Sequence, residues 1–581
     1  MNKRIVRRHP IAVDGLPTAS FHPVLRRVLQ NRGVNHPQEV DHSLQRLLPY
    51  ADLKNIDAAV NVLVHALENK FRIVIIGDFD ADGATSTVVA VRCLRLLGAN
   101  EVHYRVPNRF KFGYGLTPQI VEETAKELQP DLIITVDNGI SSVDGVRAAN
   151  ALNIAVLITD HHLQGPVLPA AAAIVNPNQH GDQFASKNLA GVGVIFYVML
   201  ALRARLRESN WFSARGISEP NLAQVLDLVA LGTVADVVIL DQNNRVLVNQ
   251  GLKRIRAGHA NAGINALLEV AKRSPDRLVA SDLGFAIGPR LNAAGRLDDM
   301  SIGIRCLLTD SIEEARTLAN QLDHLNLARR EIESDMQTQA LSALDQFKVE
   351  DNSELPLGLC IYNPTWHQGV IGILAGRLKD RLHRPVIACA PGDDGEIKGS
   401  ARSVVGVHIR DVLDAVAARH PGLLTKFGGH SMAAGLTIKQ ENLATFQAAF
   451  DAEVRLHLDP ATLHAEILSD GELSGTDFTL DLAQMLRDAA PWGQGFASPV
   501  FDGHFTVFSQ RVLKEKHLKL VLDHPGLKKQ IEAIAFNAIG DDGKQPVKPG
   551  DGIHLAFKLE INEFRGESNL QLMVEHLQRI E

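Results

Sequence analysis

The stretch that decides the fold is GDFDADG, residues 77–83, which directly follows the apolar run Ile73 to Ile76. An apolar run that stops at a glycine is typical of a buried parallel strand, and open α/β sheets place their sites where such strands end. Asp78, Asp80 and Asp82 put three carboxylates at this point. Because like charges repel one another, the group indicates a cation, and hard oxygen ligands suit Mg²⁺ or Mn²⁺. Acidic residues also cap helices and turns, so this stretch alone leaves a structural role open.

Two more apolar runs end in polar side chains. Residues 132–136 lead into Asp137-Asn138-Gly139, and residues 154–158 lead into Thr159-Asp160-His161-His162. Helical patterns alternate with these runs, at residues 84–97, 117–128 and 142–152. The alternation predicts a parallel sheet with right-handed crossovers, whose strand ends converge on one crevice. Asp236, at the end of a helix-like apolar segment, would add a further acid.

These residues resemble the motifs of the DHH phosphoesterase superfamily, and the form GDFDADG resembles its RecJ branch. The residues that carry the resemblance are Asp78, Asp80, Asp137, Asp160, His161, His162 and Asp236. Segments of the second half resemble the same branch, at residues 288–296, 366–372, 399–403, 427–430 and 491–496. The likeness runs from about residue 50 to the C-terminus. It implies an exonuclease that degrades single-stranded DNA from its 5′ end.

Pattern and resemblance together predict an α/β protein. We expect a parallel-sheet DHH domain and a smaller α/β DHHA1 domain joined by a long helix, with a C-terminal OB-like β-barrel domain. The expected divisions are an N-terminal extension (1–55), the DHH catalytic domain (56–240), a helical region with the long connecting helix (241–347), the DHHA1 domain (348–458) and the OB-like nucleic-acid-binding domain (459–581). Residues 311–347 lack Gly and Pro, which favours one helix, with a coiled coil as the alternative. Periodicity in the last domain fits another small barrel equally well.

Composition limits the classes of function. The net charge of −7 argues against a uniformly basic nucleic-acid binder, so a DNA path is expected to be a local stripe. Basic residues cluster at Lys3-Arg4 with Arg7-Arg8, at residues 253–256 and at Arg511 to Lys519, although each cluster fits an ordinary solvated face as well. The 4 cysteines are widely spaced, which predicts neither a disulfide framework nor a zinc site. The N-terminus lacks the apolar core of a signal peptide, and the longest apolar stretch, 189–202, is too short to span a membrane. We therefore expect a cytoplasmic protein without a membrane partner. We also expect a monomer.

The DHH resemblance implies two ions of Mn²⁺ or Mg²⁺. The implied ligands are Asp78, Asp80, Asp137, His161 and Asp236. Asp137 would bridge the ions, Asp78 would bind one of them, and the other three residues would bind the second ion. Two metals activate a water and stabilise charge on the phosphate, as phosphodiester hydrolysis requires. The imidazole ligand favours Mn²⁺ somewhat over Mg²⁺.

Three further side chains are expected to take part in catalysis. His162 would contact the scissile phosphate or protonate the leaving 3′ oxygen, both of which an imidazole can do near neutral pH. Asp160 would orient a histidine, and Asp82 would do the same.

Substrate contacts are implied mainly in the second half. Ser400 and Arg402, together with Arg109, resemble the 5′-phosphate pocket of the RecJ branch. We expect Arg290, Asn292 and Arg296 to bind substrate from a Gly-flanked loop. Gly428, Gly429 and His430 resemble the glycine-rich signature of the DHHA1 domain, where glycine lets the backbone approach a phosphate or sugar closely.

The leading hypothesis is a 5′ to 3′ exonuclease that degrades single-stranded DNA to 5′-mononucleotides in recombination and repair. The resemblance also implies a single-strand-binding protein and a helicase as partners. Two other functions remain open. A DHH phosphodiesterase on short oligonucleotides or cyclic dinucleotides would not need the C-terminal β domain, and a non-catalytic DNA-binding DHH scaffold would not need every metal ligand.

Overall fold

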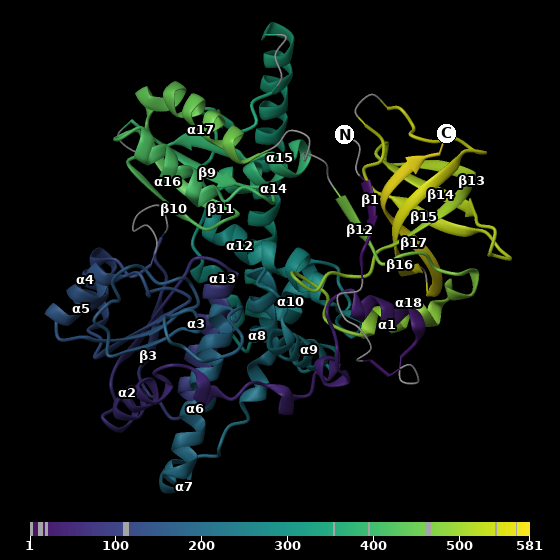
Figure 1. The fold of residues 1–581 in the computed structure, drawn as a ribbon. Helices are drawn as coiled ribbons and strands as arrows, with labels where there is room; N and C mark the ends of the chain where they lie inside the picture. Colours follow the sequence, from purple (N-terminus) through teal and green to yellow (C-terminus); the bar gives the residue numbers. More distant parts are fainter. Residues whose placement is uncertain are drawn as a thin grey trace. The chain divides into compact units, whose positions relative to one another are not determined.

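The computed structural model describes residues 4–9, 16–17, 21–108, 115–351, 355–392, 395–458, 466–540, 543–564 and 566–580. The chain forms two compact units, whose elements are traced in Figure 1. The larger unit contains residues 5–323 and 468–581, and the smaller unit consists mainly of residues 324–467. Each unit is described by itself.

A five-stranded parallel sheet forms the centre of the first half of the larger unit. Its order is β3-β2-β4-β5-β6, with β2 at Ile73–Gly77, β3 at Val102–Arg105, β4 at Leu132–Val136, β5 at Ala155–Thr159 and β6 at Ala173–Val175. Every residue of β2 and β4 is buried, which is why both read as unbroken apolar runs. The predicted parallel sheet is confirmed, whereas the short strands β3 and β6 were not predicted.

Helices cover the sheet, and their apolar faces complete its cores. They are α2 (Ile56–Glu68), α3 (Ala81–Leu96), α4 (Pro118–Leu128), α5 (Val143–Ala151) and α6 (Gly191–Glu208). Val74 and Ile76 of β2 share one core with Ile120 of α4 and Val146 of α5. Because successive strand residues point to opposite faces, the residues between them face the other side, where α3 packs against β2. This arrangement leaves the carboxyl ends of the strands available for a site.

Residues 226–308 are mostly helical, and the sequence predicted this for residues 241–310. The elements are α8 (Leu226–Ala235), α9 (Gln242–Arg256), α10 (Ala262–Val270), the π-helical turn η6 (Leu283–Ile287), α12 (Gly288–Leu297) and α13 (Ser301–Leu308). The expectation of a Gly-flanked loop at residues 288–296 was wrong, because this segment is helix α12. A Cβ atom on Gly295 would lie 1.8 Å from the carbonyl oxygen of Phe79. Glycine therefore allows close packing here and does not break the helix.

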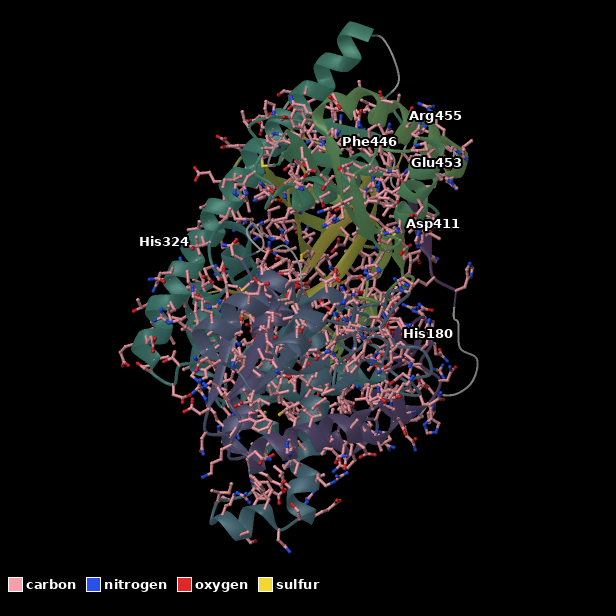
Figure 2. The ribbon with its side chains drawn as sticks, turned by 90° about the vertical axis from the view of Figure 1, so that its left-hand side faces the viewer. His180, His324, Asp411, Phe446, Glu453 and Arg455 are labelled. Atoms are coloured by element: carbon pink, nitrogen blue, oxygen red, sulfur yellow. The ribbon has the colours of Figure 1, made fainter. Side chains whose placement is uncertain are left out.

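The long helix is confirmed as α14 (Ile312–Asp351), which has 40 residues and continues from the larger unit into the smaller one. The smaller unit has the sheet order β10-β11-β9-β8-β7. Its elements are β7 (Leu359–Tyr362), α15 (Ile371–Leu382), β8 (Val386–Pro391), β9 (Glu396–Arg402), α16 (Ile409–Arg419), β10 (Lys426–Gly429), β11 (Ala433–Lys439) and α17 (Leu443–His457). Phe446 and Phe450 of α17 stack in its core, with ring centroids 6.1 Å apart. Glu453 lies on α17 as well, and Phe446 and Glu453 are labelled in Figure 2. Glu453 forms an ion pair with Arg419.

The C-terminal strands close into a barrel of order β13-β14-β15-β17-β16, which bears out the OB-like prediction. Their bounds are β13 Phe501–Leu513, β14 His517–Asp523, β15 Ile531–Ala535, β16 Gly552–Phe564 and β17 Glu567–Arg579. Closure leaves no exposed sheet edge. The remaining named elements are β1 (Arg4–Arg7), α1 (Pro23–Gln30), α7 (Trp211–Arg215), α11 (Ala280–Asp282), β12 (Glu466–Ser469), α18 (Leu480–Asp488) and short 3₁₀ turns.

A turn at residues 491–496 fixes the start of the barrel to the helical region. Leu240 donates its backbone N–H to the carbonyl of Gln494 at 2.8 Å. The guanidinium of Arg245 lies over the ring of Phe496, with 4.1 Å between Cζ and the ring centroid. The 491–496 turn thus holds the chain segment that begins just after Asp236.

All four cysteines are buried and none forms a disulfide, although the Sγ atoms of Cys360 and Cys389 lie 3.8 Å apart. In the described ranges, no helix combines the length and the apolar character that crossing a membrane requires.

Candidate metal centre

The strand ends bring the predicted acids together. Asp78 follows β2, Asp137 follows β4 and Asp160 follows β5, so all three lie at one edge of the parallel sheet. Asp236 is the C-cap of α8. Donor atoms within 4.8 Å of one another form three groups among the described residues: Asp78, Asp80 and Asp137; Asp82, His161 and Asp236; and Asp137, His161 and His162. Asp137 belongs to two of these groups.

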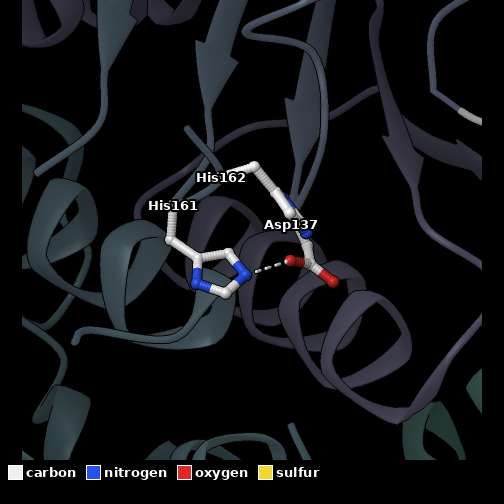
Figure 3. A group of neighbouring side chains, drawn as sticks. All are labelled: Asp137, His161 and His162. Atoms are coloured by element: carbon white, nitrogen blue, oxygen red, sulfur yellow. Dashed lines mark ion pairs between the residues drawn. The ribbon is translucent and has the colours of Figure 1, made fainter. Parts of the chain in front are cut away.

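Asp137 and His161 form the middle of the cluster. Oδ1 of Asp137 lies 3.1 Å from Nε2 of His161 (Figure 3), which is also 3.6 Å from Oδ2 of Asp236. Burial, followed by the charges of Asp82 and Asp80, raises the pKa of Asp137 well above its ordinary value. The same causes raise the pKa of Asp236. A divalent cation would relieve this repulsion, so the donor set fits Mn²⁺ or Mg²⁺.

The grouping differs in one respect from the implied ligand assignment. Asp80 lies with Asp78 and Asp137, whereas Asp82 takes a place beside His161 and Asp236. The ligand assignment itself stays a prediction.

Asp82 also holds the start of helix α6. Its carboxylate accepts the backbone N–H groups of Gly191 at 2.7 Å and Val192 at 2.9 Å. Burial and the charge of Asp80 nevertheless raise the pKa of Asp82 to about 7. Asp82 therefore connects the N-terminus of α6 to the group of acidic side chains.

Asp160 organises the loop that carries both histidines. Its Oδ1 accepts the backbone N–H of His161 at 2.7 Å and lies 2.8 Å from Nδ1 of His162, while Oδ2 accepts the N–H of Ile140. Burial alone would raise the pKa of Asp160, but the hydrogen bond with His162, the charges of both histidines and the N–H of Ile140 together outweigh burial and lower it. Burial would lower the pKa of His162, yet the same hydrogen bond and nearby carboxylates raise it to about 9. Asp160 thus orients His162.

Two glycines that sequence reasoning missed make room for the carboxylates. A Cβ atom on Gly191 would lie 2.6 Å from the Cβ of Asp137, and one on Gly232 would lie 2.9 Å from Oδ1 of Asp82. The one sign of Gly191 in the sequence is its position near the start of the apolar stretch 189–202. Nothing in the sequence indicates which side chain such a glycine faces.

Helix α12 packs over the loop that carries the predicted ligands Asp78 and Asp80. Oδ1 of Asn292 accepts the backbone N–H of Ala81 at 2.7 Å, directly after Asp80. Arg290 pairs with Asp323 at 2.8 Å and donates to the carbonyl of Ala286. Asn292 and Arg290 thus make contacts within the protein, and Arg296 lies on the same helix. Substrate binding by these three residues stays a prediction.

Ser400 and Arg402 lie side by side on β9 in the smaller unit. Arg402 donates to Oγ of Ser400 at 3.1 Å. A Cβ atom on Gly372, in the first turn of α15, would lie 3.0 Å from both side chains. Burial lowers the pKa of Arg402, which has no carboxylate ion-pair partner in the part of the chain that the structure describes. A partly buried guanidinium of this kind suits an anion. Arg109, the third predicted member, lies outside the described residues.

Gly428 and Gly429 lie on strand β10, followed by His430. Gly429 has a φ of +148°, and a Cβ atom there would lie 2.4 Å from the carbonyl oxygen of Ala433. The β10–β11 pairing therefore requires this glycine. The predicted contact of the segment with a phosphate or sugar stays a prediction.

Known proteins match this chain along nearly its whole length. Three family models match: the DHH family, N-terminal domain (72–233), the DHHA1 domain (357–456) and the RecJ OB domain (469–576). The single-stranded-DNA-specific exonuclease RecJ of Dickeya dadantii is 54% identical over 572 residues, which covers 98% of each chain. The protein of the same name from Escherichia coli is 52% identical over 571 residues, again 98% of each. The chain belongs to the RecJ family.

Solved structures of RecJ family relatives contain the expected ions. The structure of RecJ from Thermus thermophilus in complex with Mn²⁺ matches with a TM-score of 0.80 and 29% identity, covering 100% of this chain and 80% of that one. The structure of the same protein in complex with Mg²⁺ matches with a TM-score of 0.74. Both ions agree with the oxygen-rich donor set with one or two imidazoles described above.

Proposed function

We propose that this RecJ family protein is a metal-dependent exonuclease specific for single-stranded DNA, which it degrades from the 5′ end to 5′-mononucleotides in recombination and repair. One observation carries the proposal: buried Asp137 offers donor atoms to two groups of metal-ligating side chains at once. A shared carboxylate between two groups is what a two-metal hydrolytic site requires.

Asp78, Asp80, Asp137, His161 and Asp236 would hold two ions of Mn²⁺ or Mg²⁺. Bound there, the ions supply Lewis acidity for water activation and neutralise charge on the phosphate. The protein's own contribution is to fix the donors: β4 and its tight turn hold Asp137, and Gly191 allows α6 to close over it.

His162 is the group best placed to act on the phosphate without serving mainly as a ligand. Asp160 holds its Nδ1 at 2.8 Å, which fixes the plane of the ring. A ring fixed in this way would contact the scissile phosphate or deliver a proton to the leaving 3′ oxygen.

The 5′ polarity would come from the pair Ser400 and Arg402 with Gly372. A guanidinium and a hydroxyl side by side can bind the oxygens of a terminal phosphate. A phosphate inside the strand has fewer free oxygens for such contacts. A 5′-phosphate group in this pocket would set the end from which the strand is cut. Support comes from the geometry of Arg402, whose partly buried guanidinium donates to Oγ of Ser400 at 3.1 Å.

The barrel would hold the following part of the strand. The turn between β13 and β14 carries Lys514 and Lys516. Phe536, which follows β15, lies beside this turn: the residue is 56% exposed, and its ring lies 5.2 Å from that of His517. Basic side chains beside an exposed aromatic ring suit single strands, which offer phosphates and unpaired bases. Lys519 contributes less because it pairs with Glu532 at 2.9 Å.

We further propose that the protein works in the cytoplasm as a monomer and receives its strand with the help of a single-strand-binding protein and a helicase. The family resemblance supports these points. Analytical ultracentrifugation of the purified chain tests the monomer directly.

The decisive experiment compares nucleic acids at fixed metal concentration. Purified protein with Mn²⁺ is incubated with single- and double-stranded DNA labelled at either end, with short oligonucleotides and with cyclic dinucleotides. We expect mononucleotides from the 5′ end of single strands alone. Rapid hydrolysis of the small substrates and none of the long strand would contradict the proposal.

Two variants connect the activity to the metal centre. Asp137→Ala should abolish hydrolysis because it removes donors from two groups, whereas Asp78→Ala should recover part of its activity at high Mn²⁺. Asp144→Ala is the matched control, since Asp144 is an exposed acid on α5 that pairs with Arg147. Full activity of Asp137→Ala would remove the basis of the metal assignment.

A further inference from the structure

Phe285 is the most exposed large apolar side chain on an element that packs beside the metal centre. It is 85% exposed and lies in the π-helical turn η6. Single exposed apolar residues are common on protein surfaces and need no explanation. A π-helical turn, by contrast, is rare and occurs often at functional sites. Both features at one residue prompt the question of what the ring contacts.

Glycines at both ends of η6 place it against the helix that carries Asp236. A Cβ atom on Gly284 would lie 3.2 Å from the side chain of Val234, and one on Gly288 would lie 3.2 Å from the Cβ of Ala235. Val234 and Ala235 directly precede Asp236 in the chain. The backbone on either side of Phe285 is therefore in contact with the last turn of α8, next to a predicted metal ligand.

The turn is held rigidly while its ring is left in water. Leu283, Ala286 and Ile287 are buried, so η6 is anchored on both sides of Phe285. Arg290 adds a hydrogen bond of 2.6 Å to the carbonyl of Ala286. A ring on such a support loses little conformational freedom when it meets a ligand.

A second exposed apolar side chain stands at the same end of α8. Val237 follows Asp236 directly, is 64% exposed and has a φ of +62°. A β-branched residue is strained in this left-handed conformation, and such strain is tolerated mostly where function requires it. Two exposed apolar side chains thus lie on segments that meet at the end of α8, next to Asp236.

We propose that Phe285 is a stacking platform for a nucleobase of the strand whose phosphate is held at the metal centre. The proposal rests on the function proposed above and adds the residue that receives a base. When a phosphate is held at the centre, the bases on either side of it lie close by. Every base has a flat apolar face, so an aromatic ring can stack on a base of any identity. Polar base-reading groups are not required, which suits an enzyme that must cut every sequence.

The test combines protein variants with single strands that lack one base. Phe285→Ala, Phe285→Leu and Phe285→Tyr are compared with wild type on 5′-phosphorylated strands, each bearing one abasic nucleotide at a successive position from the 5′ end. On the intact strand, Phe285→Ala should lower kcat/KM by roughly tenfold, mainly through KM, and Tyr should restore it where Leu does not. With the abasic nucleotide at one particular position, wild type and Phe285→Ala should become equal.

The controls separate stacking from folding and from the proposed function. Because the ring is exposed, the variants should keep the wild-type Tm, and Leu152→Ala, an exposed apolar residue at the end of α5, should cut like wild type. An unchanged kcat/KM of Phe285→Ala, or a loss that is the same on every abasic strand, would overturn the proposal, as would full rescue by Leu. A wild-type protein that does not cut the intact strand would instead refute the nuclease function itself.

Discussion

Gly191 faces Asp137 so closely that an added Cβ atom would lie 2.6 Å from the Cβ and 2.7 Å from Oδ1 of that aspartate. The start of helix α6 therefore forms one wall of the metal centre. It also donates two backbone N–H groups to Asp82, so the wall is tied to the acidic cluster from a second side.

Gly191→Ala should weaken Mn²⁺ binding by roughly tenfold or more, because the methyl group must displace Asp137 or the helix. Titration calorimetry with Mn²⁺, without DNA, measures this directly. The matched control is Gly376→Ala on α15, where an added Cβ atom has no neighbour within 4 Å. If both variants bind Mn²⁺ like wild type, the close approach of Gly191 does not constrain the centre.

Arg402→Ala should reduce the preference for a 5′-phosphate over a 5′-hydroxyl end by about 10- to 100-fold, since a charge-assisted contact to the phosphate is lost. Cleavage of the 5′-hydroxyl strand should change much less. Gly372→Ala should act in the same direction, because its methyl group would press on both Arg402 and Ser400. The control is Arg381→Ala. Arg381 is an exposed arginine on α15, the helix that also carries Gly372, and its variant should keep the wild-type preference. A wild-type preference in Arg402→Ala would place the pocket elsewhere.

Reversing the charges of Lys514 and Lys516 should weaken binding to a long single strand and flatten its salt dependence. Each lost phosphate contact lowers the slope of log K against log salt by about 0.7. Hydrolysis of very short oligonucleotides should change far less. Circular dichroism confirms folding, and reversal of exposed Lys126 on α4 serves as the control. An unchanged slope in a folded double variant would mean that the hairpin lysines are only solvated.

Acid should destabilise the larger unit through His42. Burial, with the positive charges of Arg245 and Lys253, lowers the pKa of His42 to about 4 from 6.5. Between pH 6.5 and 4, His42 is protonated in the unfolded chain but stays neutral in the folded chain. The contribution of His42 to the free energy of unfolding is therefore fully present above pH 6.5 and is lost as pH falls toward 4. Between pH 7 and 5 the loss should be about 2 kcal/mol, and His42→Gln should lack it. Urea unfolding of both proteins in EDTA at the two pH values tests this, and parallel losses would contradict it.

The sequence predicted the sheet of the metal centre because local signals and burial agree there. Strands β2, β4 and β5 are buried on both faces, so their apolar runs are unbroken and each ends where its polar group begins. The long helix α14 was equally clear, since nothing interrupts its helix-forming residues. The short edge strands β3 and β6 were missed because three or four residues leave little periodic signal.

The errors and omissions concern contacts between distant segments. Residues 288–296 read as a loop because of their glycines, but Gly288 packs on Ala235 and Gly295 on Phe79 within a helix. Asp82 joined His161 and Asp236 in space although it is closest in sequence to Asp80. Gly191 carried no local sign of its partner Asp137. Such roles are set by which elements meet in the fold, and a single sequence does not record this.

The hydrogen bond between Leu240 and Gln494 bears on how such a chain can be divided or recombined. A chain that ends before residue 491 would uncover Leu240, which lies only four residues beyond Asp236. It would also leave Arg245 without its aromatic partner. Grafting a barrel from a relative would succeed only if the 491–496 turn travels with it and meets a compatible partner segment. The two stretches should therefore be inherited together, although Leu240 and Gln494 lie 254 positions apart in the chain.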